Sequence, residues 1–271
     1  MNTILLDGAM GTQLIQRGVK LEPVSELVNL NHPAVVQEIH REYVEAGSGI
    51  LYSCSFGANR RKLGEYASVE AIITAALRNA RLAAADRAKV GLDVSMIGTL
   101  LEPYGELSES EAEELYAEQL TAGASADLFA FETYFDLNEA VLAVKTAKKL
   151  FPQIPCFATM TVQRGGKTLM GAGIEQLTAE LEEAGADAIG LNCSLGPVEL
   201  LPLMETMAKR TALPLIAKPN AGIPDVSGAY PMNAAEFAAA MKPILALGVA
   251  YAGGCCGTNP DYIAALRRNL A

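Results

Sequence analysis

The sequence predicts an α/β protein of the closed (β/α)₈ TIM-barrel type, and three observations lead to this fold class. Short apolar runs alternate strictly with helix-like segments, eight of each, along 271 residues. The runs are continuously apolar, which is typical of parallel strands that are buried on both faces. Eight such units in a chain of this length favour a closed barrel over an open doubly wound sheet, which is the alternative.

The predicted strands are rich in Val, Ile, Leu and Ala, and each is followed by a turn rich in Gly, Asn or Thr. This pattern of an apolar run with a turn after it is typical of buried strands. The predicted strands are residues 4–7, 50–55, 93–99, 128–133, 156–162, 188–193, 214–218 and 249–253.

Each predicted strand is followed by a segment with helical character. Asn31 supplies a cap signal before the first segment, and acidic residues open the third, where they suit the helix N-terminus. Because no linker or charge block divides the chain, we expect one domain over residues 1–271. The predicted helices are residues 33–46, 69–87, 110–122, 137–150, 175–184, 198–210, 234–247 and 261–270.

Composition and charge exclude several classes of function. The formal net charge of −10 argues against binding to nucleic acid or to anionic lipid. We expect no membrane span, because no apolar run approaches the ~20 residues that a bilayer requires. The first residues lack the basic segment of a signal peptide, and five cysteines indicate reduced thiols. We therefore expect a cytoplasmic protein with reduced thiols.

The chemically active residue types fall where the predicted strands end. Active sites of this fold lie at the carboxyl ends of the strands, so we expect these residues to surround one mouth. The clusters are Asp7-Gly8, Ser53-Cys54-Ser55, Glu132-Thr133, Asn192-Cys193, Pro219-Asn220-Ala221-Gly222 and Gly254-Cys255-Cys256.

The adjacent thiols of Cys255 and Cys256 are the strongest single signal. Neighbouring cysteines rarely form a disulfide with each other, so a shared metal is the better interpretation in a reducing compartment. Cys193 would complete a three-sulfur zinc site with one position open for a substrate. Neither His32 nor His40 ends a predicted strand, and we expect each to be a structural or a surface residue.

The charge of such a site indicates its chemistry. Three thiolates on a divalent ion leave a net charge of −1, which makes a poor activator of water. A free thiol has a pKa of ~8.5, and ligation to zinc deprotonates it without removing its nucleophilicity. The site therefore predicts S-alkylation, in which a metal-held substrate thiolate attacks an electrophilic carbon. We expect Cys156, which lies inside an apolar run, to be a core residue.

Taken together, the motifs resemble the homocysteine S-methyltransferase family, and within it the homocysteine-binding barrel of cobalamin-dependent methionine synthase. They follow the family's order over essentially the whole chain. The motifs are Leu6-Asp7-Gly8-Ala9-Met10-Gly11-Thr12, Phe56-Gly57-Ala58-Asn59, Phe131-Glu132-Thr133, Gly190 to Pro197, Pro219-Asn220-Ala221-Gly222 and Gly253 to Thr258.

The resemblance implies a (β/α)₈ barrel that binds Zn²⁺ through Cys193, Cys255 and Cys256 and methylates homocysteine to methionine. It also implies substrate contacts at further residues. These are Glu132, for the substrate ammonium; Asp7, Gly8, Gly11 and Thr12, for the carboxylate and amino end; and Asn220, for the open zinc position when no thiol is bound.

The chain ends after its eighth helical segment, so we expect the methyl donor to be a free small molecule or to be carried by a separate protein. The resemblance of residues 192–197 and 219–222 to methionine synthase favours methylcobalamin on a separate corrinoid protein. S-methylmethionine, S-adenosylmethionine and a betaine are the alternative donors.

Two departures from the family motifs bear on the substrate. Cys54 stands where relatives usually carry Asn, and residues 97–103 lack their Gly-Pro-x-Gly. Because of these departures, a thiol other than homocysteine is an alternative substrate. A non-catalytic module that binds zinc or a corrinoid protein, and a phosphate-binding barrel, are the remaining alternatives.

Overall fold

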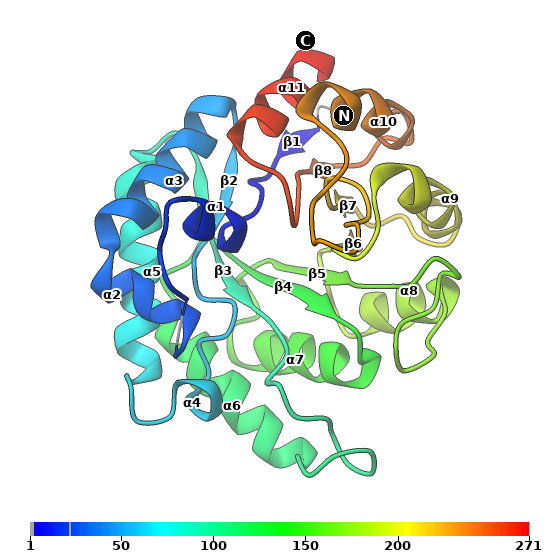
Figure 1. Ribbon diagram of the computed structural model, residues 1–271. Coiled ribbons are helices and arrows are strands. Elements are labelled where there is room, and N and C mark those ends of the chain that lie inside the picture. Colours follow the sequence, from blue (N-terminus) through cyan, green and yellow to red (C-terminus); the bar gives the residue numbers. More distant parts are fainter. Residues whose placement is uncertain (1–2, 22, 271) are drawn as a thin grey trace.

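The computed structural model describes residues 3–21 and 23–270, and its strands form one parallel sheet that curves into a barrel. Figure 1 shows the strands at the centre with helices around them. The sheet order is β1-β8-β7-β6-β5-β4-β3-β2, which confirms the predicted (β/α)₈ barrel. The strands are β1 (Ile4–Leu5), β2 (Ile50–Tyr52), β3 (Lys89–Val94), β4 (Leu128–Tyr134), β5 (Cys156–Met160), β6 (Ala188–Asn192), β7 (Leu215–Lys218) and β8 (Tyr251–Ala252).

A side chain helps to close the barrel between β1 and β2. The backbone N–H of Gly49 donates to the carbonyl of Leu5 at 2.8 Å, as in a parallel ladder. Further along, the N–H of Tyr52 donates to Oδ2 of Asp7, also at 2.8 Å. The carboxylate of Asp7 therefore satisfies a strand N–H at the seam and is held in place by it.

Among the described residues, eight longer helices cover the outside of the barrel, as predicted, and short helical segments lie in the loops after β1 and β2. Several longer helices begin at side-chain caps, and α10 begins with a capping box between Asn233 and Glu236. None of the described helices combines the length and apolar character needed to span a bilayer. The helical segments are α1 (Gly11–Gln16), η1 (Ser25–Leu27), α2 (Val28–Asn31), α3 (Pro33–Ala46), α4 (Arg60–Leu63), α5 (Val69–Ala84), α6 (Glu109–Ala122), α7 (Leu137–Leu150), α8 (Ile174–Glu183), α9 (Pro197–Ala208), α10 (Ala234–Ala246) and α11 (Pro260–Leu270).

The third strand differs from its prediction. The sequence predicts residues 93–99, whereas β3 is Lys89–Val94 and residues 95–99 belong to the following loop. The strand begins at the exposed Lys89 and contains Asp93, and these two charges conceal its otherwise apolar pattern. Asp93 consequently lies near the carboxyl end of its strand, on the side of the predicted mouth.

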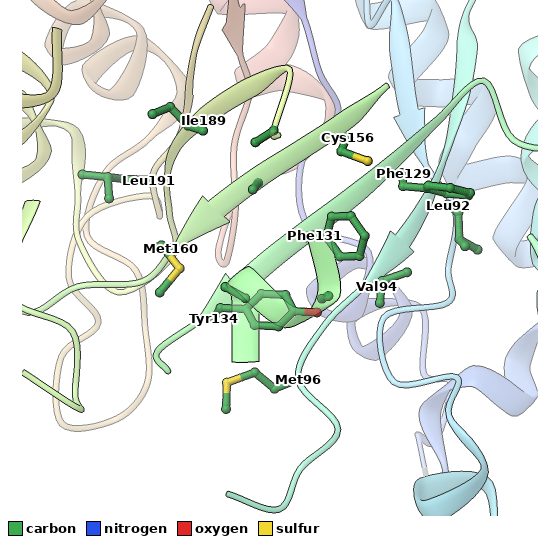
Figure 2. Packing of buried hydrophobic residues seen from close by; sticks show 14 of the residues in the cluster. Leu92, Val94, Met96, Phe129, Phe131, Tyr134, Cys156, Met160, Ile189 and Leu191 are labelled. Carbon is green, nitrogen blue, oxygen red and sulfur yellow. The ribbon is translucent and has the colours of Figure 1, made fainter. Parts of the chain in front are cut away.

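Two apolar layers hold the barrel together. A small cluster fills its interior and includes Leu6, Ile50 and Phe157. A much larger cluster lies between the strands and the helices, and Figure 2 shows its members on β3 to β6, with Cys156 among them. Cys156 is fully buried, which confirms its predicted place in the core.

His40 provides a test of the outer layer. It lies on α3, is fully buried, and has no hydrogen-bond partner at either ring nitrogen. Burial lowers its pKa from 6.5 to about 4, so the unfolded state binds more protons between these values. The free energy of unfolding should fall by about 3 kcal/mol as the pH falls from 6.5 to 4, relative to the His40→Leu variant.

Urea unfolding at several pH values measures this contribution directly. His32→Leu changes the exposed histidine before α3 and is the matched control, which should keep the pH dependence of the wild type. Equal pH dependence in the wild type and His40→Leu would contradict the prediction.

Candidate functional site

A cavity of about 270 Å³ opens at the carboxyl ends of the strands. Five of the six strand-end clusters predicted from sequence contribute to its wall. The cluster Pro219 to Gly222 does not, and the buried side chain of Asn220 lies outside the wall. The predicted residues in the wall are Asp7, Gly8, Gly11, Thr12, Ser53, Cys54, Glu132, Thr133, Cys193, Gly254, Cys255 and Cys256.

Three thiols meet on one side of this cavity. The Sγ atoms of Cys193, Cys255 and Cys256 all lie within 4.8 Å of one another. The distance between Sγ of Cys193 and Sγ of Cys256 is 3.8 Å. Tetrahedral zinc, with Zn–S bonds of about 2.3 Å, places its sulfur ligands about 3.8 Å apart. The three thiols therefore fit a tetrahedral ion with a fourth position left for another ligand.

Backbone hydrogen bonds beyond the strand ends place the adjacent thiols. The N–H of Gly254 donates to the carbonyl of Asp7 at 3.0 Å, and the N–H of Cys255 donates to that of Pro219 at 2.8 Å. A Cβ atom on Gly254 would lie 2.4 Å from Oγ1 of Thr258, which leaves no room for a side chain. Glycine at this position therefore allows the side chain of Thr258 to pack closely against the backbone that carries both thiols.

The third thiol lies on a backbone that most residues avoid. Cys193 and Ser194 have φ values of 59° and 56°, in the left-handed region, and such strain is often found at functional sites. The N–H of Cys193 donates to the carbonyl of Lys218 at 3.1 Å and fixes this turn against β7. Cys193 is therefore held by the end of the neighbouring strand.

Asn192 joins the ends of β4 and β6 beside the thiols. Its Oδ1 accepts from the N–H of Thr133 at 2.9 Å, and its Nδ2 donates to Oγ1 of Thr133 at 2.7 Å. Thr133 is also left-handed, with φ of 65°, at an irregularity of β4. Asn192 thus stabilises the unusual backbone that follows Glu132.

The proximity of the thiols sets their protonation. Hydrogen bonds from Cys193 and Cys255 lower the pKa of Cys256, while hydrogen bonds to Cys193 and Cys256 raise that of Cys255. The three sulfurs together therefore favour one thiolate and two thiols. Three thiolates at this spacing require a cation, because close like charges oppose ionisation. The donor set thus fits a bound metal ion.

A group of charges lies in the same cavity. Nζ of Lys218 is 2.8 Å from Oε2 of Glu132, 3.6 Å from Oδ1 of Asp7 and 3.9 Å from the ring centroid of Tyr52. Asp93 also lines the cavity. Burial raises the pKa of Asp7 to about 6 although Lys218 opposes the shift. The cavity wall therefore contains one ammonium, from Lys218, and four carboxyl groups, from Asp7, Glu26, Asp93 and Glu132.

Sequence reasoning missed Lys218 and Asp93 as site residues. Lys218 ends the predicted strand 214–218 and Asp93 begins the predicted strand 93–99, and neither was expected in the site. A charged residue within an otherwise apolar, buried strand was the signal that could have found both, since such charges are rarely buried without a function.

The two departures from the family motifs lie at the mouth but outside the three-thiol group. Cys54 lines the cavity, and its pKa is raised by burial. Gly98, Thr99 and Leu100 line a neighbouring hollow of about 360 Å³, which also includes Lys62 and Phe135. Neither histidine lines the cavity, as expected. His32 is exposed before α3, and His40 lies in the core.

The chain is similar to known proteins over nearly its whole length. The sequence profile of the family described as homocysteine S-methyltransferase matches residues 4–270. The methionine synthase of Mycobacterium leprae is 34% identical over 284 residues, covering 95% of this chain and 23% of that protein. That of Mycobacterium tuberculosis is also 34% identical, covering 95% and 24%. The chain spans about a quarter of the length of these relatives.

Solved structures share the fold. The metallated form of the homocysteine methyltransferase MmuM from Escherichia coli superposes with a TM-score of 0.82 at 23% identity, covering 99% of this chain and 96% of that one. The carboxyl transferase domain of Rhizobium etli pyruvate carboxylase superposes with a TM-score of 0.58 at 14% identity, covering 99% and 47%. At these identities the likeness establishes the barrel alone.

Asn192 offers a test of how the mouth is held together. Asn192→Ala removes both hydrogen bonds to Thr133, and the backbone N–H of Thr133 loses its acceptor, Oδ1 of Asn192. The free energy of unfolding should therefore fall by about 1–3 kcal/mol. Urea unfolding measures the change. Asn138→Ala, at an exposed position in the first turn of α7, is the control and should stay within about 0.5 kcal/mol of the wild type. Equal unfolding midpoints for the two variants would contradict the assigned role.

Proposed function

The chain belongs to the homocysteine S-methyltransferase family, and from this premise we propose that it methylates homocysteine to methionine at a zinc ion bound by Cys193, Cys255 and Cys256. The observation that carries the proposal is the meeting of these three thiols, with all sulfur atoms within 4.8 Å, at the active end of a barrel. Because the chain spans only part of its longer relatives, the activity of those proteins enters here as a proposal.

The three cysteines supply a ligand set that suits a substrate thiol. A zinc ion on these three cysteines would supply a fourth position for homocysteine, whose thiol would be held there as a nucleophilic thiolate. The backbone bonds that fix Gly254, Cys255 and Cys193 hold the ligand atoms in one geometry before the substrate arrives. Such preorganisation lowers the barrier to an in-line attack on a methyl group.

The amino-acid end of homocysteine has complementary groups across the cavity. Glu132 and Asp7 are the proposed acceptors for the ammonium, since charge-assisted bonds to carboxylates are the strong ones. The turn from Gly8 to Thr12 leads into α1, whose first N–H groups have no partners within the helix. These groups are the proposed donors to the substrate carboxylate. Asn220 follows Pro219, whose carbonyl accepts from the N–H of Cys255, and its buried Oδ1 has no hydrogen-bond partner, which supports its proposed place at the open zinc position.

The methyl donor that we propose is methylcobalamin on a separate corrinoid protein. The similarity to methionine synthases over about a quarter of their length supports this choice. S-methylmethionine, S-adenosylmethionine and betaine are the rival donors, and a different thiol acceptor is the rival substrate. We propose a single catalytic domain over residues 1–271 in the cytoplasm, with neither nucleic acid nor membrane as a partner.

An assay of product formation tests the proposal. Zinc-loaded protein is incubated with homocysteine and each donor in turn, and methionine is measured by mass spectrometry. We expect methionine with the methylated corrinoid protein and little with the small-molecule donors. If no donor yields methionine, homocysteine methylation is wrong.

Cysteine variants connect the activity to the metal. Cys193→Ser, Cys255→Ser and Cys256→Ser should each weaken zinc binding more than about tenfold, the lower limit for losing even an outer-shell partner. Each variant should also lose methionine formation. Cys54→Ser changes a thiol in the same cavity that is not a proposed ligand and is the matched control for metal binding, which should retain one zinc per chain. Retention of zinc by all three ligand variants, measured by elemental analysis, would contradict the assignment.

A further inference from the structure

A buried hydroxyl group connects the turn that carries the adjacent thiols to the turn that follows β1. Thr258 is fully buried and lies two residues after Cys256. Its Oγ1 donates to the carbonyl of Cys255 at 2.7 Å and accepts from the backbone N–H of Ala9 at 3.2 Å. A hydroxyl has one hydrogen to donate and lone pairs to accept, so Thr258 can satisfy both backbone groups at once.

Tyr43, on α3, holds the same segment at its other backbone group. Its hydroxyl donates to the carbonyl of Ala9 at 2.9 Å, and its side chain is fully buried. The backbone approaches both side chains closely. A Cβ atom on Gly8 would lie 2.6 Å from Oγ1 of Thr258 and 2.8 Å from the hydroxyl of Tyr43, so only glycine fits there. Both polar backbone groups of Ala9 are therefore held by buried side chains.

Further hydrogen bonds join the same two turns. The N–H of Gly254 donates to the carbonyl of Asp7 at 3.0 Å, and the N–H of Gly257 donates to Oγ1 of Thr12 at 3.4 Å. The turn after β8 carries two of the three proposed zinc ligands. The turn after β1 leads to the N–H groups that we propose for the substrate carboxylate. The protein therefore fixes the separation of these two places before a ligand binds.

We infer that Thr258, together with Tyr43, is a positioning residue that fixes the distance between the bound sulfur and the carboxylate of the substrate, so that the site selects a γ-thiol over a β-thiol amino acid. Homocysteine and cysteine differ by one methylene, and a C–C bond is about 1.5 Å long. One missing methylene changes specificity by roughly ten- to two-hundredfold. The inference rests on the proposed function, since it assumes that the two ends of the ligand lie at these two turns.

Three thiols separate the spacing of the site from binding at either end. L-homocysteine has the proposed spacing, and L-cysteine is one methylene shorter. The third, 3-aminopropane-1-thiol, matches homocysteine but lacks the carboxylate. Dissociation constants of zinc-loaded protein are measured by isothermal titration calorimetry, and zinc content by elemental analysis. The wild type should bind homocysteine at least roughly tenfold more tightly than cysteine.

Thr258→Val keeps the shape of the side chain and removes the hydroxyl, so the N–H of Ala9 loses its acceptor. The ratio of the homocysteine affinity to the cysteine affinity should fall by about three- to tenfold, the usual effect of losing a hydrogen bond. The affinity for 3-aminopropane-1-thiol should change by less than about twofold, because this thiol does not use the turn after β1. Zinc should still be bound. Tyr43→Phe removes the other bond to Ala9 and should lower the same ratio.

Two control variants separate positioning from packing. Thr258→Ser keeps the hydroxyl and should keep the affinity ratio of the wild type. Thr146→Val is the matched control, because it removes a buried hydroxyl that donates to the carbonyl of Leu142 within α7, outside the cavity. It should leave the ratio unchanged. If Thr258→Val does not fold, Thr258→Ala should give the same loss of selectivity.

Each failure has its own signature. An unchanged affinity ratio in Thr258→Val, or equal weakening of all three thiols, overturns the inference. Loss of zinc from Thr258→Val also overturns it, because the effect would then arise at the metal. A zinc-loaded wild type that binds none of the three thiols overturns the proposed function, and the inference with it.

Discussion

Three backbone hydrogen bonds just beyond the strand ends determine the geometry on which the rest of the site depends. They run from Gly254 to Asp7, from Cys255 to Pro219 and from Cys193 to Lys218. Each continues the parallel pairing of the barrel past the last residue of a strand. Because the barrel fixes the distances between strands, these bonds fix the distances between sulfurs that are more than sixty positions apart in the chain.

Lys218 connects the two halves of the cavity. Its carbonyl holds the turn of Cys193, and its ammonium holds Glu132 and Asp7. Its position at the end of β7 therefore relates the thiol group to the carboxylates across the mouth. The local strain at Thr133, Cys193 and Ser194 and the buried excess of negative charge are both unfavourable for folding. The large apolar layer outside the strands offsets these terms, and such local conflicts are expected where a fold carries a ligand site.

The sequence predicted the barrel and the meeting of the thiols because both follow from strong patterns. Apolar runs of this length have few alternatives, and the strand-end rule places Cys193 beside Cys255 without any knowledge of side chains. The third strand was misplaced because Lys89 and Asp93 interrupt its apolar pattern. Lys218 and Asp93 were overlooked as site residues because the role of a buried charge depends on the partners that it faces in the folded chain. Asn220 was expected at the metal from its motif, and its place there stays a prediction, because its buried Oδ1 has no hydrogen-bond partner that would assign it another role.

The central claim is that three protein thiolates hold a zinc ion whose fourth position accepts the substrate sulfur. X-ray absorption spectroscopy at the zinc edge, with and without homocysteine, tests it most directly. The account predicts three sulfur ligands at about 2.3 Å and one lighter atom in the free protein, changing to four sulfur ligands when homocysteine is added. A zinc shell that contains fewer than three sulfurs, or one that homocysteine leaves unchanged, would contradict it.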